Sequence, residues 1–262
     1  MKYTAGFIGA GNMGGALLRA VAKEIGGENT AVFDINESCA DAAAKESGAQ
    51  KVTIKELTEQ SEYIFLGVKP NVIEKVCKQI SGYLSSCSTV ISMAAGVDIA
   101  SVCAALNTDR VIRIMPNTPA SVGEGMILYC VGGGVTDESG FLRIMNSCGV
   151  IDKIDEKLID AAAALSGCGP AFVYMFIEAL ADGAVSRGLP RAKAQLYAEQ
   201  TVLGAAKLAL ESHRHPGELK DAVCSPGGTT IEGVLALENG AFRHTVSNAV
   251  TAAYDKTAKL KK

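Results

Sequence analysis

Histidine is scarce in this sequence, and its cysteines do not occur in closely spaced pairs. Three histidines are present in 262 residues, His213, His215 and His244, and the His213-x-His215 pair lacks a third ligand at a spacing typical of zinc sites. The eight cysteines contain no C-x-x-C motif, which argues against a zinc site and against a disulfide framework. We therefore expect no metal, reduced and buried thiols, and histidines at solvated helix ends.

Runs of positive charge and long apolar segments are also missing. The net charge is −3, the pI is near 5.7, and Lys and Arg do not cluster before residues 259–262, so no basic surface for nucleic acid or an anionic membrane is indicated. No apolar segment reaches the roughly 18 residues of a membrane span, and residues 1–9 are too short for the apolar region of a signal peptide. These absences predict a cytoplasmic protein with small-molecule partners.

What the first part of the chain does have is an alternation of short β-rich runs and helical patterns, from residue 3 to about 153. This alternation predicts βαβ units and a doubly wound, parallel sheet in a domain spanning residues 1–154. Met13, Leu17, Leu18 and Val21 share one face of a predicted crossover helix. The predicted strands are Tyr3 to Gly9, Thr30 to Ile35, Tyr63 to Val68, Ser88 to Met93, Arg110 to Met115, Met126 to Val131 and Gly149 to Ile154.

From Asp155 onward the β-rich runs thin out and alanine-rich segments at helical period replace them. Breaks at Gly169-Pro170, Gly188-Leu189-Pro190 and His215-Pro216-Gly217 divide these segments into helices, so residues 155–262 form a second, all-α domain. The helices expected over residues 171–186 and 192–210 are apolar around most of their circumference. A bundle of about 100 residues offers little interior, which predicts that these helices are buried between subunits.

A glycine-rich motif marks the first strand-to-helix turn. The segment Ile8-Gly9-Ala10-Gly11-Asn12-Met13-Gly14 contains G-x-G-x-x-G between a predicted strand and an amphipathic helix. The glycines allow a tight turn and close approach of the backbone to a pyrophosphate, whose charge the N–H groups at the helix start would meet. The motif in this context predicts a Rossmann-like domain that binds a dinucleotide.

Asp34, twenty positions past Gly14 at the end of the second predicted strand, bears on the choice of dinucleotide. A carboxylate there accepts hydrogen bonds from ribose hydroxyls and repels a 2′-phosphate, and no Arg or Lys follows within ten residues, so this pattern favours NADH. The alternative is that Asp34 caps the following helix, a role equally open to Asn36 or Ser38.

Three further strand ends meet the same edge of such a sheet. They are Gly67-Val68-Lys69-Pro70, Ala94-Ala95-Gly96 and Met115-Pro116-Asn117-Thr118-Pro119. Their small residues, prolines and amide suit close contact with a ligand, although each alone is also typical of an ordinary turn. We expect Val68, Lys69, Pro70, Ala94, Ala95 and Gly96 to contact the cofactor and Asn117 to contact the substrate.

Six motifs, in order and in both predicted domains, resemble those of pyrroline-5-carboxylate reductases over residues 5–255. The most specific covers residues 219–232, Leu-Lys-Asp-Ala-Val-Cys-Ser-Pro-Gly-Gly-Thr-Thr-Ile-Glu. The others are Val68-Lys69-Pro70, Ala94-Ala95-Gly96-Val97, Met115-Pro116-Asn117-Thr118-Pro119, Leu165-Ser166-Gly167-Cys168-Gly169-Pro170-Ala171 and His215-Pro216-Gly217. The resemblance implies hydride transfer from NADPH or NADH to the C=N bond of pyrroline-5-carboxylate, the last step of proline synthesis.

The resemblance also implies an assembly and a substrate site. The helical domain would interlock two subunits, each active site closed by its partner, and dimers commonly assemble into decamers. At residues 225–230 it assigns the substrate carboxylate to Ser225, Gly227 and the amides of Gly228, Thr229 and Thr230, and the ring nitrogen to the Thr230 hydroxyl. Free N–H groups at a helix start suit an anion; the alternative is a plain helix cap made by Thr229 or Thr230.

The chain differs from the family pattern at two positions, and two alternative functions are also compatible with the fold. Many relatives have small polar residues in place of Asp34, and some have Asn in place of Ala222. The first rival is a β-hydroxyacid dehydrogenase of the 6-phosphogluconate or hydroxyisobutyrate type, which needs a helical Lys base followed by Asn, and Lys207 lacks that Asn. The second is a dinucleotide sensor without enzymatic activity.

Overall fold

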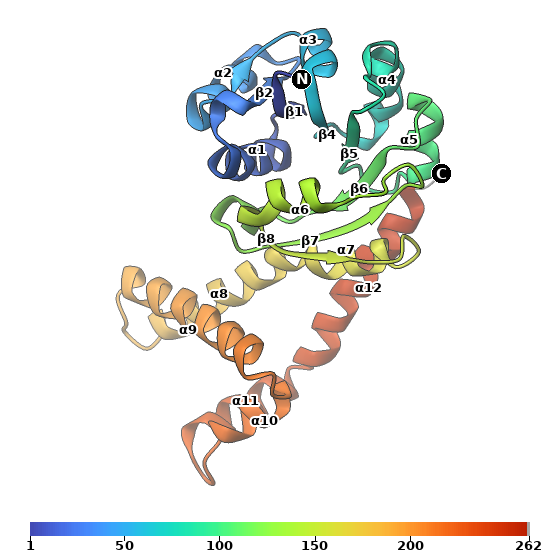
Figure 1. Cartoon of the computed structure of the whole chain (residues 1–262). Coiled ribbons are helices and arrows are strands. Elements are labelled where there is room, and N and C mark those ends of the chain that lie inside the picture. The colour runs from blue at the N-terminus through green and yellow to red at the C-terminus, as the bar shows by residue number, and fades with distance from the viewer. Residues whose placement is uncertain (261–262) are drawn as a thin grey trace. The chain divides into compact units, whose positions relative to one another are not determined.

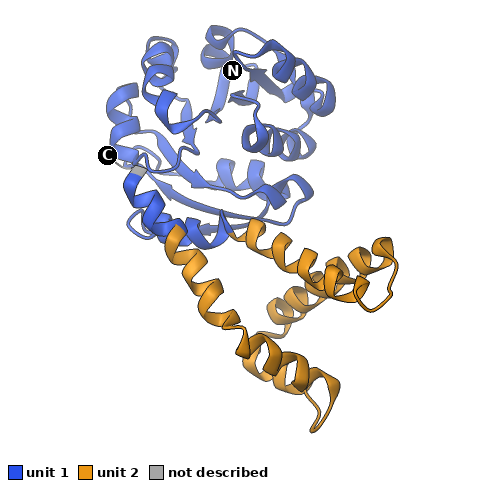
Figure 2. Cartoon of the chain, turned by 180° about the vertical axis from the view of Figure 1, so that it is seen from behind, with its two compact units in different colours: residues 1–168, 253–262 blue, residues 169–252 orange. Residues whose placement is uncertain are grey.

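The computed structural model describes residues 1–260 and divides into two compact units (Figure 2). Unit 1 comprises Met1–Cys168 with the chain end from Ala253, and unit 2 comprises Gly169–Ala252. The first division therefore falls later than the boundary expected after residue 154. The cause is helix α7 (Ile159–Ser166), whose Ile159 belongs to the core that packs on the sheet of unit 1.

Unit 1 is built on one eight-stranded sheet with the order β3-β2-β1-β4-β5-β6-β7-β8 (Figure 1). Seven of the strands are those predicted from the sequence, and the two-residue β3 was not foreseen. The strands are β1 (Tyr3–Ile8), β2 (Thr30–Phe33), β3 (Gln50–Lys51), β4 (Ser61–Leu66), β5 (Thr89–Ser92), β6 (Val111–Met115), β7 (Gly125–Val131) and β8 (Gly149–Lys153).

The sheet is parallel as predicted, except at one pair of strands. Strand β7 runs antiparallel to β6, with Arg113 opposite Cys130, and β8 is parallel to β7. The link between β6 and β7 contains only the short 3-10 helix η3 (Thr118–Val122), whereas a parallel neighbour needs a crossover of roughly a dozen residues or more. The sheet is therefore mostly parallel, with the β6–β7 pair as the exception.

Two hydrophobic cores cover the two faces of the sheet. On one face β1 and β4 contribute the stacked rings of Phe7 and Phe65, 4.3 Å apart, against α1 (Asn12–Ile25), α2 (Glu37–Ser47) and α6 (Ser139–Met145). On the other face lie α3 (Ile54–Gln60), α4 (Pro70–Ile80), α5 (Ile99–Leu106) and α7. Helices on both faces make this a doubly wound fold, as predicted. Three further 3-10 helices are η1 (Gly27–Asn29), η2 (Ser81–Tyr83) and η4 (Asn146–Cys148).

Unit 2 is helical and has little interior of its own. Its helices are α8 (Gly169–Val185), α9 (Arg191–Ser212), α10 (Pro216–Ala222), α11 (Thr229–Asn239) and the first part of α12 (Phe242–Leu260). Helices α8 and α9 pack through small side chains, and the hydrophobic residues of unit 2 described as buried are Ala181, Ala194 and Ala198. Large apolar side chains stay exposed, Met175 by 70 % and Leu210 by 73 %. The chain alone leaves unit 2 without a sufficient core.

One helical run of the described residues, Ile159–Val185, is long and apolar enough to span a membrane by length and composition. The expectation that no such segment exists is therefore wrong. The helix break predicted at Gly169-Pro170 corresponds to the two turn residues 167–168, which separate α7 from α8. Such a helix alone is weak support for a membrane, because an apolar helix that packs against protein passes the same test.

The cysteines are all free thiols, of which three are buried (Cys77, Cys130 and Cys148) and three are half-buried (Cys39, Cys103 and Cys224). Burial raises the pKa of Cys77 to about 11 and that of Cys148 to about 12, so both stay protonated and inert at neutral pH. The prediction of buried thiols is wrong for Cys87 and Cys168, which are exposed.

Candidate functional site

A crevice opens where the strand order of the sheet reverses. Strand β1 pairs with β2 on one side and with β4 on the other, and ligands of doubly wound folds bind outside the carboxyl ends of the strands at such a point. A cavity of about 440 Å³ lies there, entirely within unit 1. It is lined by Ile8, Gly9, Gly11, Phe33, Asp34, Ile35, Ile54, Gly67, Val68, Lys69, Val72, Lys75, Val76 and Gln79.

The glycine motif forms the turn between β1 and α1, and its three glycines have different structural roles. Gly9 has a φ of +100° and lies so close to the next strand end that a Cβ would be 2.5 Å from the Gly67 carbonyl oxygen. A Cβ on Gly14 would be 2.1 Å from the Gly9 carbonyl oxygen. A Cβ on Gly11 would meet nothing within 4 Å. The protein's own packing needs the first and third glycines, while the second leaves open space at the crevice.

Asp34, directly after β2, is hydrogen-bonded to the glycine turn. Its Oδ2 accepts a hydrogen bond from the Ala10 N–H at 2.7 Å, and its Oδ1 accepts from the Asn36 N–H at 2.8 Å. Helix α2 is capped by Asn36, whose side chain accepts from the Ser38 N–H. The alternative that Asp34 caps α2 is therefore wrong. Each carboxylate oxygen keeps a second lone pair, so Asp34 can still accept from a ribose hydroxyl.

The other predicted cofactor residues lie along the same edge of the sheet. Val68 is half-buried, and Lys69 and Pro70 are exposed at the start of α4. All three follow β4, and Val68 and Lys69 line the crevice. The segment Ala94-Ala95-Gly96 follows the neighbouring β5 and is not part of that lining. Contact of these residues with a cofactor stays a prediction.

Asn117, predicted to contact the substrate, is buried and bound to the backbone of its own unit. Its Nδ2 donates to the Ser166 carbonyl oxygen at 3.0 Å, and its Oδ1 accepts from the Met126 N–H at 2.9 Å. These bonds join the segment after β6 to the end of α7 and the start of β7. The geometry gives Asn117 a structural role in unit 1.

The predicted substrate loop, residues 225–230, precedes α11 in unit 2. Gly227 has a φ of +67°, and the Gly228 N–H donates to the Ser225 carbonyl oxygen at 3.0 Å. Gly228 occupies the cap position of α11 without a side-chain cap, so the alternative of a Thr229 or Thr230 cap is wrong. The first N–H groups of a helix have no partner within it. Thr229 and Thr230 are exposed at this helix start.

The histidines and Lys207 have ordinary surroundings. His213 ends α9, and His215 caps α10 by accepting from the Gly217 N–H at 3.0 Å, as expected of helix-end histidines. Lys207 is exposed and forms an ion pair with Glu211 at 3.7 Å, which is typical of a helix surface and not of a buried base. Across the described residues no three His, Cys, Asp or Glu side chains gather as metal ligands.

Sequence reasoning missed a buried charged cluster between β6 and the start of α7. Arg113 of β6 is 1 % exposed, and its guanidinium contacts Glu156 at 3.1 Å and Asp160 at 2.8 Å. Glu156 also accepts from the Ile99 N–H at 2.8 Å. A charged residue in the apolar run Val111-Ile112-Arg113-Ile114 was the available signal, because an arginine in a central strand needs buried partners.

Comparison with protein families and with individual proteins gives consistent matches. Residues 156–260 match the family model described as pyrroline-5-carboxylate reductase dimerisation, and residues 4–96 match the model described as NADP oxidoreductase coenzyme F420-dependent. The chain is 42 % identical to the pyrroline-5-carboxylate reductase of Arabidopsis thaliana, covering 99 % of this chain and 96 % of the relative. It is 41 % identical to that of Escherichia coli K12, covering all of both chains.

A solved structure is similar over the same extent. The crystal structure of Plasmodium falciparum pyrroline carboxylate reductase with NADP bound superposes with a TM-score of 0.90 at 35 % identity, covering 100 % of each chain. The structural similarity therefore includes both units of this chain.

Proposed function

Because this chain belongs to the pyrroline-5-carboxylate reductase family, we propose that its crevice at the strand-order reversal holds the dinucleotide and its 225–230 loop holds the substrate. The chain is an NAD(P)H-dependent oxidoreductase that reduces the C=N bond of 1-pyrroline-5-carboxylate in proline biosynthesis. The observation that carries the dinucleotide assignment is the glycine turn with its open face at Gly11. Oxidation of NADH or NADPH followed at 340 nm, with and without pyrroline-5-carboxylate, separates this enzyme from a dinucleotide sensor.

The crevice residues fit a dinucleotide. The uncapped start of α1, with Gly11 at its cap position, offers N–H groups and the positive end of a helix dipole to a pyrophosphate. Asp34 fixes the turn through Ala10 and keeps lone pairs for the ribose. When bound, the reduced nicotinamide supplies the hydride. The task of these residues is to bind and orient it, since an aligned transfer needs no protein nucleophile.

The substrate loop fits a carboxylate next to an imine. We assign the carboxylate to Ser225 and to the N–H groups of Thr229 and Thr230, because the Gly228 N–H is engaged by Ser225. Gly227 contributes its left-handed conformation, which shapes the loop. The Thr230 hydroxyl is assigned to the ring nitrogen, where it relays a proton from water. A cyclic imine nitrogen is far easier to protonate than a carbonyl oxygen, so a neutral hydroxyl suffices.

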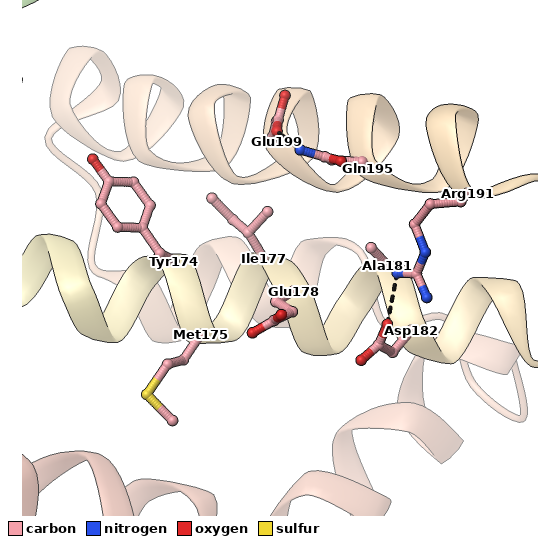
Figure 3. Close-up of a pocket in the computed structure, with 9 residues that line it drawn as sticks. All are labelled: Tyr174, Met175, Ile177, Glu178, Ala181, Asp182, Arg191, Gln195 and Glu199. Atoms are coloured by element: carbon pink, nitrogen blue, oxygen red, sulfur yellow. Dashed lines mark hydrogen bonds and ion pairs between the residues drawn. The ribbon is translucent and has the colours of Figure 1, made fainter.

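The chain forms a homo-oligomer, and we propose that the helices of residues 155–262 form its dimer interface. Unit 2 exposes apolar side chains that it cannot bury itself, and residues 156–260 match a dimerisation family. A groove of about 710 Å³ lies between α8 and α9. Figure 3 shows Tyr174 and Ile177 pointing from α8 toward α9, whereas Met175 points away from both helices. A second copy that covers these surfaces also explains why the Ile159–Val185 run needs no lipid.

We expect the purified protein to be at least a dimer at micromolar concentration, because these helix faces are too apolar to face water. Light scattering measures the mass, and sedimentation distinguishes a dimer from the decamer that the family resemblance implies. Replacing the exposed Met175 by lysine should weaken the assembly, while replacing Lys55, exposed in unit 1, should leave it unchanged. A stable and active monomer would refute the proposed interface.

The assignment of residues 1–154 to dinucleotide binding and of residues 155–262 to dimerisation and substrate binding is part of the same proposal. It is supported by the two family matches, which cover residues 4–96 and 156–260. We also propose a cytoplasmic location, supported by eight free thiols, which suit a reducing compartment. Cell fractionation with an antibody against the native chain tests it.

Asp34 gives a prediction about cofactor preference. NADH should have the higher kcat/KM, and Asp34→Ser should shift the ratio toward NADPH by relieving repulsion of the 2′-phosphate. A charge-to-phosphate contact at a partly solvated site is worth about 1–3 kcal/mol, or roughly 5- to 150-fold in the ratio. The measurement is kcat/KM for both cofactors in both proteins.

The hydrogen bonds of Asp34 define the control for that experiment. Asp34→Ser also loosens the glycine turn, because the bond to the Ala10 N–H is lost, and this should weaken both cofactors together. Asp34→Asn removes the charge but keeps an oxygen for Ala10, so it should shift the ratio with less loss of affinity. A wild type that prefers NADPH, with a ratio unmoved by either substitution, would limit Asp34 to holding the turn.

A further inference from the structure

The crevice contains two ammonium groups that the described chain does not neutralise. Lys69 and Lys75 both line it, and within residues 1–260 neither takes part in an ion pair, unlike the nearby Lys78, which contacts Glu74 at 2.6 Å. Among the described lining residues Asp34 is the one carboxylate. Both of its oxygens already accept backbone N–H bonds, which stabilise its negative charge. Two cations against one satisfied carboxylate leave the crevice suited to an anion.

The face of α4 toward the crevice explains where these cations lie. Val72, Lys75, Val76 and Gln79 line the cavity and recur at the spacing of one helical face. Lys78 lies on another face and lines a separate cavity between α4 and α5. Lys69 precedes the first turn of α4, two residues after Gly67, which packs on the glycine turn. Lys75 is six residues further, about 9 Å along the helix axis.

Apolar side chains in the same crevice are left without cover. Ile35, directly after Asp34, is 94 % exposed, and Val72 of α4 is 38 % exposed. Both line the cavity, and a planar apolar group placed against them would remove that surface from water. An adenine base is such a group when the ribose is at Asp34 and the pyrophosphate at the glycine turn. Lys69 then lies at the pyrophosphate end, and Lys75 at the adenosine end.

We propose that Lys75 binds the 2′-phosphate of NADPH and so sets the nucleotide preference in opposition to Asp34. This inference rests on the proposed dinucleotide site. The ammonium of Lys75 is a point charge on a flexible stem, and it can reach a phosphate that the rigid carboxylate of Asp34 repels. The preference of this chain for NADH or NADPH then depends on two opposing residues: Asp34, which follows β2, repels the 2′-phosphate, and Lys75 of α4 attracts it. NADPH stays usable despite Asp34.

Binding of the two half-cofactors tests the proposal without catalysis. The full-length protein is titrated calorimetrically with 2′,5′-ADP, which carries the 2′-phosphate, and with 5′-AMP, which lacks it. Lys75→Met should weaken 2′,5′-ADP about 5- to 150-fold, the range of one partly solvated charge-to-phosphate contact, and should leave 5′-AMP within about twofold. Lys75→Arg should retain most of the affinity. Lys78→Met, on the other face of α4, should bind both compounds like the wild type.

The outcomes separate the inference from the function on which it rests. Equal weakening of both compounds by Lys75→Met would assign Lys75 to the adenine or the 5′-phosphate, and no weakening would remove it from the site; either result overturns the proposal. If 2′,5′-ADP and 5′-AMP both fail to bind the wild type and to compete with NADPH, the crevice is not the dinucleotide site. In turnover, the expected result is a lower kcat/KM for NADPH with that for NADH retained in Lys75→Met.

Discussion

Replacing Thr230 by alanine should lower kcat by about 10- to 1,000-fold, with a smaller effect on dinucleotide affinity. The hydroxyl lies at the exposed start of α11 and is assigned to the ring nitrogen, where charge changes during hydride transfer. Loss of one hydrogen bond to a developing charge in the transition state typically costs this much. Steady-state kinetics with saturating pyrroline-5-carboxylate measures kcat, and calorimetric titration with the dinucleotide measures affinity.

Two neighbouring substitutions show whether the effect belongs to the hydroxyl. Thr229→Ala keeps the backbone N–H that is assigned to the carboxylate, so it should change kcat much less than Thr230→Ala does. Thr230→Ser keeps a hydroxyl and should recover most of the lost rate. A folded Thr230→Ala protein with wild-type turnover would remove Thr230 from the mechanism and leave proton delivery to water.

The parts of the site that depend on neighbouring residues could be predicted from the sequence. The glycine turn is contained in residues 9–14, so its conformational demands appear in a short motif, and the structure places Gly9 at a φ of +100°. The start of α11 follows from residues 225–230 in the same way. A local turn of this kind can be predicted without knowing which distant segments of the chain are in contact.

Contacts between distant segments could not be predicted in this way. Asp34 and Ala10 are 24 residues apart, and no sequence pattern shows that the carboxylate holds the turn. Asn117 is predicted to contact the substrate because it follows a strand end, and its amide also donates to the Ser166 carbonyl oxygen, 49 residues away, a contact with no local sequence signal. A cation for a 2′-phosphate is usually expected in the residues that follow Asp34, whereas here the fold brings Lys75 of α4 to the same crevice.

Strand direction and helix burial also depended on information outside local patterns. The length of the link between β6 and β7 was the clue that β7 runs antiparallel, since no crossover helix fits there. The apolar surfaces of α8 and α9 were predicted correctly as too extensive for one chain to bury, but the sequence does not state which side chains meet a partner. Alanines occupy the centre of the α8–α9 contact, with Ile177 and Val185 packed against them, whereas Met175 and Leu210 stay exposed.

Replacing Arg113 by methionine should lower the free energy of unfolding by about 3–5 kcal/mol, the usual cost of removing one member of a buried ion cluster. The Arg113 side chain is 1 % exposed, and Asp160 is 7 % exposed, so the substitution removes the guanidinium that forms an ion pair with this buried carboxylate. Because Asp160 belongs to α7, the substitution should also loosen the contact of α7 with β6. Urea denaturation at a fixed protein concentration measures the change, since oligomer stability depends on concentration.

The triple variant Arg113→Met/Glu156→Gln/Asp160→Leu isolates the physical cause. If the cost arises from uncompensated buried charge, removing all three charges should restore much of the stability that Arg113→Met loses, because apolar groups can replace a buried ion cluster at little cost. Arg19→Met, which breaks the exposed Arg19–Glu46 pair at 3.0 Å, should change stability by about 1 kcal/mol or less. A triple variant less stable than Arg113→Met alone would show that packing and the Ile99 bond to Glu156, not charge balance, determine the effect.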